Sequence, residues 1–239
     1  MQRDPRLGLV NRYAMIALVL SAAVILSSDT WSRAESSSAA PSGRNMSYYD
    51  VRRGLFALSQ IKTAPIVMLG DSLTEAGPWT DLTGCLQIAN RGIGGDTTKR
   101  LLDRLDDVVA LRPKAIFLMI GVNDVSLGVP GETTLGNLRA ILDRLSATDA
   151  RVFLSYILPV TASFGKKRMN GEIETLNTAF ARLAADQAGV TLLDARPQLR
   201  GADGSLRREF AYDGLHLTPR GYAVLRDTIA PHVAEYCPR

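Results

Sequence analysis

The sequence predicts one α/β domain, a three-layer α/β/α sandwich around a parallel sheet. Short apolar segments that resemble strands alternate along the chain with segments of helical periodicity. The strand candidates are apolar along most of their length, as is typical of parallel strands that are covered on both faces. A chain of 239 residues with 46% hydrophobic residues is long and apolar enough for one full core.

Five segments are predicted to be strands because they are short, mostly apolar and bounded by Gly, Pro, Asn or Asp. They cover residues 65–69, 86–89, 115–120, 152–157 and 190–193.

Helices are predicted between these strands and after them, because apolar residues recur at helical spacing. Residues 46–60 are expected to add a helix before the first strand. The four apolar stripes are Leu101, Leu105, Val108 and Val109; Leu135, Leu138, Leu142 and Leu145; Ile173, Leu176, Phe180 and Leu183; and Tyr222, Leu225, Ile229 and Val233.

The first 34 residues have the pattern of a secretory signal peptide. Three arginines precede an uncharged apolar stretch over residues 13–26, and Ser32 and Ala34 are small residues at the expected cleavage site. The stretch is shorter than the ~20 residues that span a bilayer comfortably. An uncleaved membrane anchor over residues 13–28, or a core helix, is the alternative. Residues 35–45 are small and polar and are predicted to be a flexible linker, so the folded domain covers residues 46–239 of an exported protein.

Composition excludes several classes of protein. The net charge is only +4, with 28 basic and 24 acidic residues, and no cluster of Lys and Arg lies on one predicted face, so a nucleic acid is not expected as a partner. Two cysteines, Cys85 and Cys237, are too few for a disulfide scaffold or a zinc site of paired Cys-x-x-Cys motifs. One disulfide between them is possible, but the sequence does not establish it. We expect neither a metal nor an organic cofactor.

Polar segments follow four of the predicted strands, three of them directly and the fourth at the end of a loop. In a parallel sheet the carboxyl ends of the strands meet at one edge, where ligands bind, so these segments should converge there. They are Gly70-Asp71-Ser72-Leu73, the loop of residues 90–96, Gly121-Val122-Asn123-Asp124, and Asp213-Gly214-Leu215-His216 at the end of the last loop.

Two residue types in these segments suit acyl transfer. His216 follows Asp213 by three residues on a turn, so Asp213 can orient the imidazole while its other nitrogen faces a nucleophile. Ser72 follows a buried strand at the start of a helix, although a serine there can also simply cap the helix. Asn123 and the glycine-rich loop before Asp96 offer N–H donors. His232 falls near the end of the last helix, where a surface role is expected.

Together the four segments resemble the blocks of the SGNH hydrolases, also called GDSL esterases/lipases, in order and spacing. The resemblance covers roughly residues 62–232, and residues 90–98 look most like the branch of small acetylhydrolases that act on acetylated phospholipid. It implies a flavodoxin-like sheet of five parallel strands in the order 2-1-3-4-5. It also implies that Ser72 is the nucleophile, His216 the general base and acid, and Asp213 its orienter. The implied oxyanion hole comprises the N–H groups of Ser72 and Gly95 and the amide of Asn123.

The expected function is therefore hydrolysis of carboxylic esters through an acyl-enzyme, with a small-molecule, lipid or polysaccharide ester as substrate. Acetyl and other short acyl groups are expected, because the predicted loops of residues 77–84, 126–131 and 161–171 supply few large apolar side chains for a deep channel. The alternatives are an acyltransferase with the same serine chemistry, a lysophospholipase or a thioesterase. A binding protein without activity is disfavoured by the intact set of Ser72, Asp213 and His216. The oligomeric state is not predicted.

Overall fold

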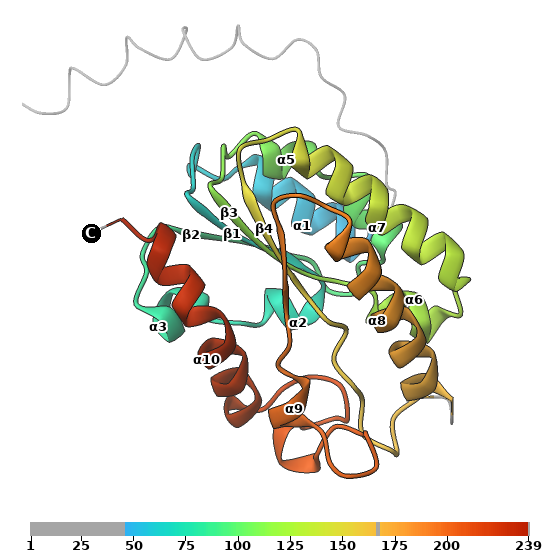
Figure 1. The fold of residues 1–239 in the computed structure, drawn as a ribbon. Helices are drawn as coiled ribbons and strands as arrows, with labels where there is room; N and C mark the ends of the chain where they lie inside the picture. The colour runs from blue at the N-terminus through green and yellow to red at the C-terminus, as the bar shows by residue number, and fades with distance from the viewer. Residues whose placement is uncertain (1–45, 166–167, 239) are drawn as a thin grey trace, which may run out of the picture. The chain divides into compact units, whose positions relative to one another are not determined.

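The structure is a computed structural model that describes residues 46–165 and 168–238. It confirms the predicted parallel sheet (Figure 1), in which five strands are ordered β2-β1-β3-β4-β5 and every neighbouring pair is parallel. The strands are Ile66–Gly70 (β1), Ile88–Gly92 (β2), Ala115–Met119 (β3), Arg151–Ser155 (β4) and Val190–Leu193 (β5).

Helices connect the strands and cover the sheet. Their bounds are Tyr48–Ala57 (α1), Ser72–Glu75 (α2), Trp79–Thr83 (α3), Thr98–Leu102 (α4), Asp106–Val109 (α5), Val122–Leu127 (α6), Gly131–Ser146 (α7), Met169–Ala185 (α8), Arg196–Leu199 (α9) and Pro219–Tyr236 (α10), with a short 3-10 helix at Arg208–Phe210 (η1).

Alternate residues of each central strand face two separate cores. In β1, Val67 and Leu69 pack with the apolar faces of α4, α5, α7 and α8. Ile66 and Met68 pack on the other side with α3, α9 and α10. This two-residue period places a hydrophobic core on each face of the sheet, as the three-layer prediction requires.

Most of the predicted helices are confirmed by the residues that they bury. The stripes of α8 and α10 are buried throughout, as are Leu138, Leu142 and Leu145 of α7. α10 begins at Pro219, and the Thr218 side chain accepts a hydrogen bond from Gly221 N. This cap and the proline at the first helical position fix where the last helix begins, three residues after His216.

Three local predictions were wrong. β2 begins at Ile88 rather than at residue 86, and Leu86 is 84% exposed in the turn before it. Residues 77–84 are not a loop but contain α3, whose Trp79 is buried. The stripe from Leu101 to Val109 is divided between α4 and α5 by tighter turns, in which Arg104 N bonds to Leu101 O and Asp107 N bonds to Arg104 O.

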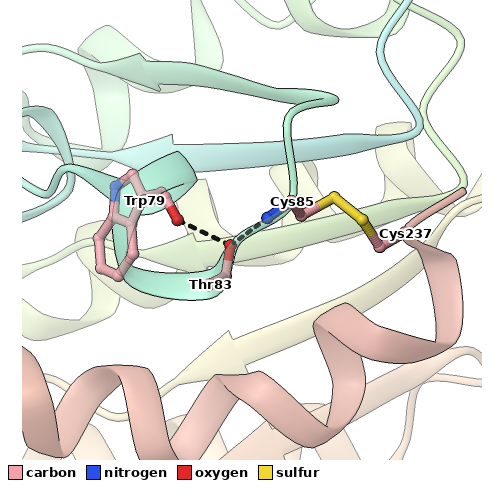
Figure 2. The surroundings of a disulfide bond; sticks show 4 residues. All are labelled: Trp79, Thr83, Cys85 and Cys237. Carbon is pink, nitrogen blue, oxygen red and sulfur yellow. Dashed lines mark hydrogen bonds between the residues drawn. A yellow bond between two sulfur atoms is a disulfide. The ribbon is translucent and has the colours of Figure 1, made fainter. Parts of the chain in front are cut away.

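The two cysteines form a disulfide (Figure 2). Cys85 Sγ is bonded to Cys237 Sγ, with 5.9 Å between the Cα atoms and a sequence separation of 152. Thr83 Oγ1 donates to Trp79 O and accepts from Cys85 N, which connects the cysteine to the end of α3. The bond therefore joins the C-terminal end of α10 to the chain just before β2.

The N-terminal predictions concern residues that the structure does not describe. The signal or anchor segment of residues 1–34 and the linker of residues 35–45 both lie outside residues 46–165 and 168–238. Within those described ranges, every helix is too short or too polar to cross a bilayer.

Candidate active site

Ser72 lies where β1 ends and α2 begins. The preceding Asp71 caps this helix, because its carboxylate accepts a hydrogen bond from Leu73 N at 3.0 Å. The capping role considered for Ser72 is therefore filled by Asp71, and the Ser72 hydroxyl is available for another partner. Gly70 lets the strand end approach its neighbour, since a Cβ there would lie 2.1 Å from Met119 O.

His216 is that partner. Its Nε2 lies 2.9 Å from Ser72 Oγ, across 144 residues of sequence. Its Nδ1 lies 2.6 Å from Asp213 Oδ2. Since the carboxylate accepts the Nδ1 proton, Nε2 is left as the acceptor that faces the serine hydroxyl.

The turn that carries His216 is fixed by Asp213 and Gly214. Asp213 Oδ1 accepts from the backbone N–H groups of Leu215 and His216 at 2.9 and 2.7 Å. Gly214 has a φ of +98° and lies against Thr161 and Phe164, so a side chain would not fit there. Partial burial alone would raise the pKa of Asp213, but these bonds and the bond from the imidazole outweigh it and lower the pKa below its usual value.

The loop after β2 and the start of α6 lie against each other. Asn123 Nδ2 donates to Asp96 O at 2.8 Å, and the buried Asp124 accepts from Thr98 N and Thr98 Oγ1 at 2.9 and 2.6 Å. Asn123 Nδ2 carries a second N–H that does not take part in the bond to Asp96. These bonds bring Gly95 and Asn123, both predicted as donors, to the same edge of the sheet.

Gly94 and Gly95 differ in whether their N–H groups donate a hydrogen bond within the protein. Gly94 N donates to Glu75 Oε2 at 2.6 Å. Gly95 is exposed with a φ of +77°, and no described residue accepts a hydrogen bond from its N–H. The geometry therefore favours Gly95 over Gly94 as the free donor, which agrees with the residue that the sequence resemblance selects.

A buried ion pair stabilises the loop that follows β2. Arg104 Nε lies 2.7 Å from Asp96 Oδ2, and both side chains are completely buried. Arg104 Nη2 also donates to Gly70 O at 3.1 Å, immediately before Asp71 and Ser72. Arg104 thus connects the end of β1 to the loop after β2.

Sequence reasoning did not identify Arg104 or Glu75. Glu75 lies three residues after Ser72, so the two residues share one face of a helix. This spacing did not indicate which groups the Glu75 carboxylate contacts. His232 lies away from this edge, as expected, and its ring is tilted against that of Phe153 with 4.6 Å between the ring centroids.

Tyr212 is a further exposed group beside the site. It is 73% exposed, and its ring stacks on that of His216 with 5.9 Å between the centroids. Its backbone N–H also donates to His216 O at 3.0 Å, so the tyrosine is held next to the imidazole by both its ring and its backbone.

A hydrogen-bonded Ser, His and Asp at the carboxyl edge of a parallel α/β sheet is typical of enzymes that hydrolyse esters. A family model described as a GDSL-like lipase/acylhydrolase family matches residues 68–224. The chain belongs to this family and is a hydrolase that acts on ester bonds.

Individual relatives agree with this assignment. The chain is 30% identical over 173 residues to platelet-activating factor acetylhydrolase IB subunit alpha1 of Pongo abelii. The matched region covers 69% of this chain and 73% of the relative. A solved structure from Streptococcus pneumonia whose name refers to platelet activating factor is 30% identical, with a TM-score of 0.69 over 78% of this chain and 91% of that one. A structure named as an acylhydrolase from Bacteroides fragilis shares the fold at 23% identity, with a TM-score of 0.71 over 81% of this chain and all of that one.

Proposed function

We propose that the protein hydrolyses carboxylic esters through an acyl-enzyme formed on Ser72. The single observation that carries this proposal is the continuous chain from Ser72 Oγ to His216 Nε2 and from His216 Nδ1 to Asp213 Oδ2, at 2.9 and 2.6 Å. His216 takes the hydroxyl proton as Ser72 attacks the ester carbonyl, and Asp213 stabilises the imidazolium that forms.

The second half of the reaction uses the same groups. His216 passes its proton to the departing alkoxide, which leaves as the alcohol, and the acyl group stays on Ser72. Water then attacks the acyl-enzyme while His216 takes its proton, and the proton returns to Ser72 as the carboxylic acid departs. The N–H groups of Ser72 and Gly95 and the amide of Asn123 form the proposed oxyanion hole, since donors aimed at the developing charge stabilise it most.

We also propose that the preferred acyl group is acetyl or similarly short. Trp79 is buried and donates from Nε1 to Thr74 O, so its ring packs in the core. Met169 is buried and Phe164 is partly buried against the core, so residues 161–171 leave little large apolar surface exposed. Burial of a long chain contributes ~0.8 kcal/mol per methylene only where an apolar channel receives it. The curated relatives are named acetylhydrolases, which supports a short acyl group here.

Export from the cytoplasm forms part of the proposal. The Cys85–Cys237 disulfide supports it, because disulfides persist mainly in oxidising compartments. The mature chain is then expected to begin near Glu35, which N-terminal sequencing of the protein from its own host would show. Met1 or Gln2 at the terminus of membrane-bound protein would favour the anchor over residues 13–28 instead.

The experiment that tests the function is a hydrolysis panel of p-nitrophenyl esters from two to sixteen carbons, with Ser72→Ala and His216→Ala beside the wild type. Both variants should fall to near background with unchanged circular dichroism, and wild-type kcat/KM should be highest for the short esters. Full activity in either folded variant would overturn the catalytic proposal. A kcat/KM that climbs steadily past about eight carbons would overturn the short-acyl proposal alone.

The alternative is transfer of the acyl group to an acceptor alcohol. Added alcohols at fixed ester concentration distinguish the two reactions by product analysis. Free acid should remain the main product, whereas an alcohol ester as main product would identify an acyltransferase.

A further inference from the structure

Glu75 makes three close contacts that connect separate parts of the site. It is the last residue of α2, the helix that begins with Ser72. We propose that Glu75 is a positioning residue, which holds the Gly94–Gly95 loop so that the Gly95 N–H faces the carbonyl attacked by Ser72. This inference rests on the proposed function and assigns a role to a residue that neither the motif blocks nor the proton transfers include.

The two carboxylate oxygens of Glu75 have different partners. Oε2 accepts the Gly94 N–H at 2.6 Å. Oε1 accepts the Tyr48 hydroxyl at 2.6 Å and lies 2.7 Å from Arg52 Nε, both on α1. Hydrogen bonds to an ionised acceptor are shorter and roughly twice as strong as neutral ones. The Glu75 side chain is only 17% exposed, so water competes little for these oxygens.

The side chains of Glu75, Tyr48 and Ser72 surround the Gly94 backbone. A Cβ built on Gly94 would lie 3.1 Å from Glu75 Oε2, 3.4 Å from Tyr48 Cε1 and 3.8 Å from Ser72 Cβ. Gly94 therefore lies directly against the proposed nucleophile, with the Tyr48 ring and the Glu75 carboxylate around it.

The loop needs such a restraint because of its composition. Two consecutive glycines have a wide choice of backbone angles, and Gly95 has a positive φ with no atom within 4 Å of a built Cβ. Only the direction of the peptide between Gly94 and Gly95 decides where the Gly95 N–H points. The bond from Asp96 N to Ile93 O at 3.1 Å closes the turn on the far side of these glycines. Glu75 holds the Gly94 N–H on the near side and Tyr48 covers the same residue, so the peptide between Gly94 and Gly95 is restrained from both ends.

Glu75→Ala and Glu75→Gln test this role. The alanine variant should lower kcat by about 10–100-fold with little change in KM. This loss is smaller than that from removing one oxyanion donor, because the Gly95 N–H is misdirected and not removed. The glutamine variant retains an oxygen that can accept the Gly94 N–H and should recover activity to within about 5-fold of wild type. Affinity for a boronic acid inhibitor, which forms a tetrahedral adduct on serine, should fall in parallel with kcat.

Two further variants complete the experiment. Gly94→Ala crowds Glu75 Oε2 while the Arg52 ion pair remains, and it should also lower kcat; it serves as the test if Glu75→Ala does not fold. Tyr49→Phe is the matched control on α1, since the Tyr49 hydroxyl donates to Arg100 O at 3.1 Å and does not contact Glu75. It should leave kcat and boronic acid affinity unchanged.

An unchanged kcat in folded Glu75→Ala, or unchanged kcat in Gly94→Ala, would overturn the inference. A loss of kcat in Glu75→Ala without a loss of boronic acid affinity would also overturn it, because the effect would then be structural. Activity that persists in Ser72→Ala is a different result, which would overturn the proposed function itself.

Discussion

At the scale of single residues, Asn123 lies where its amide can serve the reaction. One of its N–H groups is bonded to Asp96 O, which fixes the side chain and leaves a second donor. We predict that Asn123→Ala loses roughly 10²–10³-fold in kcat, the usual effect of removing one oxyanion donor. Steady-state kinetics with a short ester measures this. A rise in KM with constant kcat would show instead that Asn123 binds the ground-state substrate.

Asp71 is a buried carboxyl next to the proposed nucleophile. Burial raises the pKa of Asp71 to about 7, helped by the nearby carboxylates of Asp96 and Asp124 and opposed by the Leu73 N–H. The unfolded chain releases this proton near its ordinary pKa of about 3.9. The folded state therefore holds the proton more tightly, and stability is lost as the pH rises through about 7.

Asp71→Asn tests this pH dependence, because the amide keeps the acceptor for Leu73 N–H and cannot ionise. Between about pH 5 and about pH 8, the free energy of unfolding of the wild type should fall relative to that of the variant, by on the order of 2 kcal/mol. Urea unfolding at several pH values measures the difference. Parallel stability curves for the two proteins would contradict the raised pKa.

At the scale of elements, α8 supports the chain after β4 with a buried amide. Asn177 Oδ1 accepts from Ile157 N and Asn177 Nδ2 donates to Ile157 O, both at 2.9 Å. Farther along the same loop, Thr161 N donates to Gly214 O, beside the turn that carries His216. Loss of the amide leaves both groups of Ile157 buried without a partner.

Asn177→Ala should therefore lower the free energy of unfolding by about 2–5 kcal/mol, since two buried backbone groups lose their bonds. Thr178→Ala is the neighbouring control, because the exposed Thr178 hydroxyl bonds only within α8, to Glu174 O. It should cost less than about 1 kcal/mol. Equal stabilities of the two variants by urea unfolding would contradict the role of Asn177.

Local patterns in the sequence predicted α8 and α10 because their apolar residues repeat with the helical period, and β1 because it is a short, continuously apolar run. The strand-end blocks predicted Ser72, Asp213 and His216 as a group, and the structure brings these three side chains together. The division between α4 and α5 was not predictable in this way. It accompanies the burial of Arg104 against Asp96, eight residues earlier, and this ion pair leaves no periodic apolar signal.

Glu75 was missed for a related reason. Its partners are Tyr48, which lies 27 residues earlier, and Gly94, which lies 19 residues later. Only the folded chain brings them to one carboxylate, so the spacing of residues around Ser72 could not identify the contact.

At the scale of the whole molecule, the disulfide should matter for stability and not for activity. Cys85 precedes β2 and so lies at the amino-terminal edge of the parallel sheet, opposite Ser72 at the carboxyl edge. Closing a loop of this length restricts the unfolded chain, so Cys85→Ser with Cys237→Ser should lower the free energy of unfolding by about 2–5 kcal/mol. The kcat should stay within about 2-fold of wild type.

Urea unfolding with and without a reductant measures this effect. Reductant should destabilise the wild type toward the double variant and leave the double variant unchanged. Identical stability of oxidised wild type and double variant would contradict the structural role of the bond.

The most direct test of the whole proposal is covalent capture of the nucleophile with a p-nitrophenyl phosphonate ester, which reacts once with an activated serine and does not turn over. We predict release of one equivalent of p-nitrophenol and a phosphonate group on Ser72, located by peptide mass spectrometry. Labelling should be absent in Ser72→Ala and strongly slowed in His216→Ala, because the attacking hydroxyl then lacks its base. A phosphonate on any other residue, or equal labelling of folded His216→Ala, would contradict the account.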